Sequence, residues 1–179
     1  MIIKVTDIPQ GGRELEFVLA AARLSGRASL HSKRANLGPS YEFQKAAQVR
    51  IKINLEGSTV LAQGSVAGYY LTSCSRCAED VQAEFNIPVQ ISLKIKNSND
   101  PNHDIEDVNF GFYDGREVDC ASFCEEFVLL SLPYSVLCDD DCKGLCPLCG
   151  INKNSDKCSC SAKQPADSPW TALKDIKIM

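Results

Sequence analysis

Histidine is scarce in this 179-residue chain, which has only His31 and His103. Neither lies in a stretch with a clear strand or helix period, so each is expected at the surface rather than as a general base or metal ligand. The sequence also has no P-loop, dinucleotide-binding fingerprint or nucleophile elbow. These absences predict a protein that is not an enzyme.

Long apolar runs are missing as well. No run approaches eighteen apolar residues, about the length that a membrane-spanning helix requires. Residues 1–7 have neither the basic start nor the apolar stretch of a secretory signal peptide. We therefore expect a cytoplasmic protein with no membrane partner.

Basic residues are few in the middle of the chain. Residues 101–150 carry two Lys/Arg against eleven Asp/Glu, whereas residues 1–50 carry eight against four. A broad phosphate-binding face needs clustered basic side chains, so the acidic middle argues against one. The remaining candidate for a basic patch consists of Arg13, Arg23, Arg27, Lys33, Arg34, Lys45 and Arg50. An ordinary solvated surface is favoured there over an RNA-contacting arm.

The hydrophobic pattern predicts a helix first and then strands. Apolar residues at roughly helical spacing favour an amphipathic helix over 13–24, ended by Gly26, with a loop or irregular strand over 28–40. Period-two alternation then predicts strands at 49–55, 59–72 and 81–96. The Glu56-Gly57-Ser58 stretch is typical of a hairpin turn. Together these strands predict an antiparallel meander with one buried face.

The segment after the meander is predicted to be a loop at 97–107, followed by short strand segments on either side of an Asp114-Gly115 turn. Asp119 is expected to cap a helix that runs to about Ser131 and is stopped by Pro133. The predicted fold class is α+β, with a meander or partly closed antiparallel sheet and one or two helices. We expect a core domain over 1–135 and a cysteine-rich tail over 136–179.

Ten cysteines are the strongest compositional signal. In a reducing cytoplasm such a count indicates metal or redox chemistry rather than a disulfide framework. Six of them lie within residues 138–160, around the zinc-knuckle sequence Cys146-Pro147-Leu148-Cys149-Gly150. In such a knuckle the proline pre-sets the turn and the glycine permits positive φ after the second ligand. The segment 138–160 is too short to form a hydrophobic core of its own, so bound zinc is predicted to stabilise its fold.

A second pair, Cys74 and Cys77, lies at the predicted turn between two strands. The eight cysteines of these two groups fill either two four-thiolate sites or one site with thiols left over, and the spacing leaves their pairing open. The predicted zinc ligands are Cys74, Cys77, Cys138, Cys142, Cys146, Cys149, Cys158 and Cys160. Cys120 and Cys124 share one face of the predicted helix and are expected to pack in the core.

Several segments follow one another in a specific order and spacing. They are Gly64–Phe85 with Cys74-Ser75-Arg76-Cys77, Val118-Asp119, Glu126, residues 129–133, residues 141–150, Asn152, Asn154, Cys158-Ser159-Cys160, Pro169-Trp170, Leu173 and Lys174. Over about residues 45–175, this series resembles the YceD family of ribosomal RNA accumulation factors.

The resemblance implies a non-enzymatic ribosome biogenesis factor needed for accumulation or maturation of 23S rRNA. Its implied partners are a ribosome assembly intermediate, 23S rRNA or a large-subunit protein. Two alternatives remain: a zinc-stapled protein–protein adaptor without RNA contact, favoured by the acidic 101–150 segment, and a thiol-redox or zinc-sensing regulator.

Overall fold

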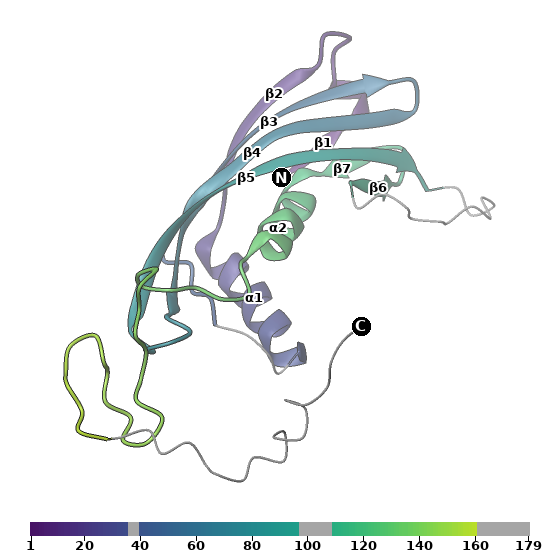
Figure 1. The fold of residues 1–179 in the computed structure, drawn as a ribbon. Coiled ribbons are helices and arrows are strands. Elements are labelled where there is room, and N and C mark those ends of the chain that lie inside the picture. The colour runs from purple at the N-terminus through teal and green to yellow at the C-terminus, as the bar shows by residue number, and fades with distance from the viewer. Residues whose placement is uncertain (36–39, 97–108, 161–179) are drawn as a thin grey trace, which may run out of the picture.

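A long, bent sheet is the frame of the molecule, and two helices lie along its concave side (Figure 1). The structure is a computed structural model, and it describes residues 1–35, 40–96 and 109–160. The strands are β1 (Ile2–Lys4), β2 (Arg13–Leu19), β3 (Ala47–Glu56), β4 (Thr59–Ser73), β5 (Asp80–Ile95), β6 (Phe110–Tyr113) and β7 (Glu117–Asp119). The helices are a 3-10 turn (Val5–Asp7), α1 (Ala21–Ala35) and α2 (Cys120–Ser131). No helix in these ranges is long and apolar enough to cross a membrane.

The main sheet has the order β2-β3-β4-β5-β6. Neighbouring strands are antiparallel except β5 and β6, which are parallel. In β3, Val49, Ile51 and Ile53 are buried, while the alternating polar side chains face solvent. The predicted meander, its Gly57 turn (φ +62°) and the α+β class are confirmed.

The helix predicted over 13–24 is wrong for residues 13–20 and right for residues 21–24. Residues 13–19 form β2, and α1 begins at Ala21 and includes Gly26, so the loop expected from residue 28 is wrong as far as Ala35. Leu15 and Leu19 of β2 are buried opposite Ile51 and Ala47 of β3. The apolar Val18 is 63% exposed on the other face. Because this exposed valine is apolar, the apolar residues of the segment have a spacing that resembles that of a helix. The segment forms a strand because it pairs with β3.

The turn at Asp114-Gly115 is confirmed, but its flanking strands do not pair with each other. The Asp114 carboxylate accepts hydrogen bonds from the backbone N–H groups of Arg116 and Glu117, both at 2.8 Å, and Gly115 has φ +86°. β6 joins β5, whereas β7 pairs with β1 in a separate two-stranded sheet. The predicted 97–107 loop, His103 and the Pro169–Lys174 motif lie outside the described residues.

Helix α2 is confirmed with its predicted cap. The Asp119 carboxylate accepts hydrogen bonds from the backbone N–H groups of Ala121 and Ser122 at 3.1 and 3.2 Å. Cys120 and Cys124 are 0% exposed, which confirms that they pack in the core. Burial raises the pKa of these thiols to about 11 and about 12, respectively. They are therefore neutral, inert core residues.

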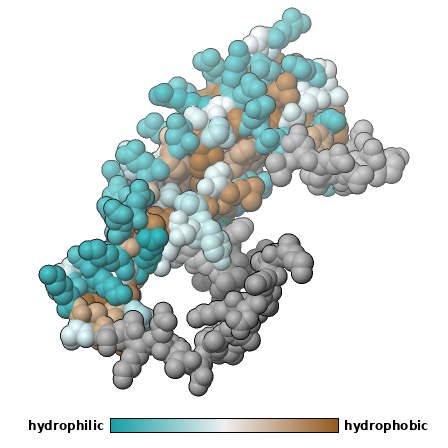
Figure 2. Space-filling model, viewed as in Figure 1, coloured by the Kyte–Doolittle hydropathy of each residue, from teal (hydrophilic) through white to brown (hydrophobic). Residues whose placement is uncertain are grey.

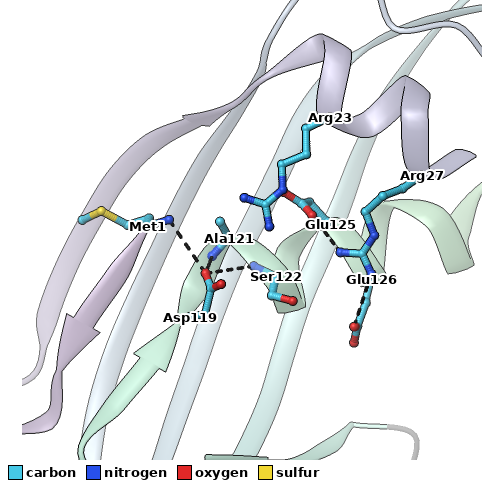
Figure 3. A network of polar contacts seen from close by, with 8 residues as sticks. All are labelled: Met1, Arg23, Arg27, Asp119, Ala121, Ser122, Glu125 and Glu126. Atoms are coloured by element: carbon cyan, nitrogen blue, oxygen red, sulfur yellow. Dashed lines mark hydrogen bonds and ion pairs between the residues drawn. The ribbon is translucent and has the colours of Figure 1, made fainter.

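A buried carboxylate ties the two helices together (Figure 3). Glu125 of α2 is 0% exposed, and its Oε2 accepts a 2.7 Å hydrogen bond from Nη1 of Arg27 on α1. Nε of Arg23 lies 2.6 Å from Glu125 Oε1 as an ion pair without hydrogen-bond geometry. Two members of the predicted basic patch are thus engaged in holding α1 against α2.

We predict that Arg27→Met lowers the free energy of unfolding by about 2–3 kcal/mol, because it strips the buried carboxylate of its hydrogen-bonded partner. Urea titration of the zinc-loaded protein measures this. Arg50→Met is the matched control, since Arg50 pairs with Glu16 where both side chains are 72% exposed. That variant should change stability by no more than about 0.5 kcal/mol. Equal losses in the two variants would contradict the buried-pair argument.

Candidate metal centres

The structure brings the eight predicted zinc ligands together in two groups of four. Cys74, Cys77, Cys138 and Cys142 form the first, which we name the sheet centre, and Cys146, Cys149, Cys158 and Cys160 form the second, the tail centre. Within each group the sulfur atoms all lie within 4.8 Å of one another. Cys146 and Cys149 of the knuckle therefore do not share a site with Cys138 and Cys142, although all four lie within residues 138–160.

The spacing of the sulfurs fits zinc. In the sheet centre, Sγ of Cys74 lies 3.8 Å from Sγ of Cys142, and Sγ of Cys77 lies 3.5 Å from Sγ of Cys138. A tetrahedral zinc ion with Zn–S bonds of about 2.3 Å separates its sulfur ligands by about 3.8 Å. Soft thiolate donors without histidine or carboxylate select zinc over calcium or magnesium. The Asp139–Asp141 run joins neither group.

The turn between β4 and β5 positions the first two ligands of the sheet centre. The backbone N–H of Cys74 donates to the Glu79 carbonyl at 2.8 Å, and that of Ala78 donates to the Cys74 carbonyl at 2.9 Å. Ala78 has φ +61°, a left-handed conformation that closes the turn. The backbone N–H of Arg76 lies 3.4 Å from the Cys74 sulfur. The Cys-x-Arg-Cys spacing thus presents both sulfurs on one side of a hairpin tip.

The other two ligands come from the chain after α2, which returns to this tip. The backbone N–H of Ser75 donates to the Val136 carbonyl at 2.8 Å, and the Ser75 hydroxyl accepts from the Val136 N–H at 3.2 Å. The Arg76 guanidinium donates to the carbonyl of Cys142 at 3.0 Å. Arg76 therefore clamps the tail loop that carries Cys142, a role that its place in the motif did not reveal.

The tail centre is built on the knuckle. The backbone N–H of Cys146 donates to the Ile151 carbonyl at 2.8 Å, and that of Gly150 donates to the Cys146 carbonyl at 2.9 Å. Gly150 has φ +74°, as the position after the second knuckle ligand requires. Cys158 and Cys160 then complete the group from the strand-free segment that follows.

Three residues outside the ligand set join the two centres. The Asn154 amide donates to the Cys142 sulfur at 3.3 Å, and its oxygen accepts from the Lys143 N–H at 2.7 Å. The Asn152 amide donates to the Glu79 carboxylate at 3.0 Å. Gly144 has φ +69°, and a Cβ there would lie 2.9 Å from the Arg76 carbonyl oxygen. The tail centre is thereby held against the sheet centre by contacts that the cysteine spacing did not indicate.

The thiols of each centre have divergent pKa values. Burial opposes ionisation of Cys74, but backbone N–H groups of its turn lower its pKa to about 6. Backbone N–H groups of the knuckle lower the pKa of Cys146 to about 6. Hydrogen bonding to a neighbouring thiol raises the pKa of Cys138 to about 12 and that of Cys160 to about 11. Four sulfurs this close ionise together only around a cation, which is the behaviour of a metal centre.

Comparison with known proteins gives a consistent match. A family model described as large ribosomal RNA subunit accumulation protein YceD matches residues 62–177, which include both centres. A chloroplastic large ribosomal RNA subunit accumulation protein YCED homolog 1 from Arabidopsis thaliana is 31% identical over 62 residues, covering 35% of this chain and 19% of its own length. Uncharacterized proteins of Mycobacterium tuberculosis and Mycobacterium bovis are 30% identical over 108 residues, covering 58% of this chain and 48% of theirs.

The chain thus spans less than half the length of these curated relatives. No solved structure matches it.

We predict that anaerobically purified protein carries two zinc ions per chain, one for each cysteine group. Cys142→Ser and Cys146→Ser should each remove one ion, because a hydroxyl is a poor zinc ligand beside three thiolates. Native mass spectrometry counts the ions directly. Cys124→Ala, a change to a core cysteine outside both groups, should keep two. Less than one zinc ion per wild-type chain would show that the thiols do not hold metal.

We also predict that the tail centre releases zinc first when a chelator is added. Only Cys146 is buried in the tail centre, whereas only Cys138 is exposed in the sheet centre. A chelator therefore reaches the tail centre more easily, and a colorimetric zinc assay should show two phases. The fast phase should vanish in Cys146→Ser and persist in Cys142→Ser. A fast phase that survives Cys146→Ser would reverse the assignment.

Proposed function

Since this chain belongs to the YceD family, we propose that it is a ribosome biogenesis factor needed for accumulation or maturation of 23S rRNA. The observation that carries this proposal is the family match over residues 62–177, because it spans the sheet centre, α2 and the tail centre. The proposed site of action is the cytoplasm. The proposed partners are a ribosome assembly intermediate, 23S rRNA or a large-subunit protein.

A non-enzymatic role is supported by the composition of the two centres. Each supplies four cysteines, which is the ligand set of structural zinc, whereas catalytic zinc sites keep a position open for water or substrate. Cys120 and Cys124, the two remaining thiols, are buried with raised pKa values and so are unsuited to nucleophilic chemistry. We therefore propose that the zinc ions stabilise a binding surface and do not take part in a reaction.

The zinc ions would have different structural tasks. The sheet centre takes two ligands from the β4–β5 turn and two from the chain after α2, so its ion would fasten a tail over 136–179 to a core over 1–135. The tail centre draws all its ligands from residues 146–160, so its ion would fold the tail itself. Loss of the first ion should detach the tail, whereas loss of the second should unfold it in place.

A protein–protein adaptor without RNA contact is the second candidate function. Residues 109–142 carry one arginine against eight acidic residues. Phosphate groups avoid such a surface, whereas basic proteins are attracted to it. An adaptor of this kind could still act in ribosome assembly through a protein partner.

Depletion of the protein in its own host is predicted to lower 23S rRNA relative to 16S rRNA. Quantitative gel or sequencing measurement of the two rRNAs reads this ratio. The wild-type gene should restore it, and Cys142→Ser should not, because the tail would no longer be fastened to the sheet. Cys124→Ala is the matched control and should restore the ratio as the wild type does.

An unchanged ratio after depletion would contradict the proposed role. Full rescue by Cys142→Ser would leave the rRNA role standing but would separate it from the sheet centre.

A further inference from the structure

A groove lies between α2, the end of β5 and β6, away from both metal centres. Its volume is about 780 Å³, and it is lined by side chains of β5, β6, β7 and α2. The cysteines of the β4–β5 turn precede the first residue of β5, whereas the groove begins at Ile91 and Leu93 near its last residue. A strand of this length spans about 50 Å along its course. The groove is therefore a surface separate from the zinc-binding end.

Apolar side chains form the floor of the groove. Ile91, Leu93 and Phe123 are buried beneath it, Phe127 is half-buried, and Leu130 at its end is 78% exposed. Figure 2 shows hydrophobic residues at the surface on the inner side of the bent sheet, where Figure 1 places α2. A contiguous apolar surface that is rimmed by polar residues is typical of a ligand-binding groove.

The charged side chains that line the groove are acidic. Its acidic residues are Asp114, Glu117, Asp119 and Glu126, and no Lys, Arg or His lines it among the residues that the structure describes. Asp114 and Asp119 accept backbone hydrogen bonds, which hold these carboxylates in place. Nη2 of Arg27 lies 3.5 Å from Oε1 of Glu126, and Met1 N lies 3.8 Å from Oδ1 of Asp119. Nζ of Lys94 lies 5.0 Å from the ring centre of Phe110, which lines the groove. These cations offset part of the negative charge, and the carboxylates outnumber them.

Glu117 adds a carboxylate that is exposed and, within the described ranges, has no side-chain partner. An apolar floor under an acidic rim excludes RNA and anionic lipid, because their phosphates would meet carboxylates. It matches a cationic ligand that also carries a bulky apolar group. The volume suits a few side chains rather than a whole folded domain.

We propose that this groove binds a Lys/Arg-rich peptide segment of a partner protein, with one bulky apolar side chain anchored beside Phe127 and Leu130. The cationic residues of the segment lie along Asp114, Glu117 and Glu126. This inference rests on the groove alone and not on the ribosomal role, so either can fail without the other.

The test uses the full-length, zinc-loaded chain and a fluorescein-labelled Lys/Arg-rich synthetic peptide that contains one Phe and one Leu. Fluorescence anisotropy should show saturable binding that weakens as salt rises, because exposed charge pairs are screened. A peptide with Glu in place of the basic residues should not bind. A peptide with Ser in place of Phe and Leu should bind about tenfold more weakly, since the apolar anchor is lost.

Two pairs of variants locate the binding on the protein. Leu130→Ser should weaken binding about tenfold, whereas Val18→Ser, at a similarly exposed apolar residue of β2, should not. Glu117→Lys should weaken binding, whereas Glu84→Lys, the same charge change at an exposed residue of β5, should have little effect. All four sites are at the surface, so the variants should remain folded, which their unfolding curves verify.

Absence of saturable binding, or equal binding by the Leu130→Ser and Val18→Ser variants, would overturn the proposal. Binding of a fluorescent RNA oligonucleotide that Leu130→Ser abolishes would also overturn it, because the groove would then be a nucleic-acid site. Another candidate occupant of the groove is the chain's own C-terminal segment, which contains the single tryptophan, Trp170. If Leu130→Ser alone shifted Trp170 emission without peptide, that segment would be the occupant and the proposal would fail.

Discussion

Four cysteine sulfurs from two distant segments meet at the tip of the β4–β5 hairpin, and the position of residues 136–160 depends on this convergence. Cys74 and Cys142 are 68 positions apart in sequence and 3.8 Å apart in space. The buried cluster at this tip has Val81 and Leu137 as its apolar neighbours, a small core for holding a chain segment. We propose that a cation shared by the four thiolates supplies the free energy that apolar burial cannot.

The two ends of the bent sheet carry different chemistry, and the helices on its concave side keep them apart. The hairpin end presents thiolates and the backbone turns that surround them, whereas the β6 end presents an apolar groove with an acidic rim. Glu125 of α2 pairs with two arginines of α1. These contacts hold α2, which forms one side of the groove, in place.

Local signals predicted local structure well. The period-two alternation of Val49, Ile51 and Ile53 found β3, and Asp119 marked the first turn of α2. The same reasoning failed for residues 13–20, because the outward-facing Val18 made a strand resemble a helix. It also failed to separate β6 from β7, since a turn at Asp114-Gly115 is compatible with a hairpin and with strands in two sheets. In both cases the strand partner, which is remote in sequence, decides the outcome.

The candidate site divides in the same way. The sequence alone determined which residues can bind zinc. The knuckle at Cys146 and Cys149 and the pair at Cys74 and Cys77 each place two thiols within four consecutive residues, a spacing that is recognised without the fold. Only the tertiary structure decided that Cys138 and Cys142 join the hairpin pair, and that Arg76 and Asn154 secure the junction. Spacing along the chain constrains ligands within one turn, but it carries no information on which turns meet. Which turns meet depends on the path of the backbone through the sheet and α2. The packing of α2 against the sheet brings residues 77 and 138 together and so closes the loop between them.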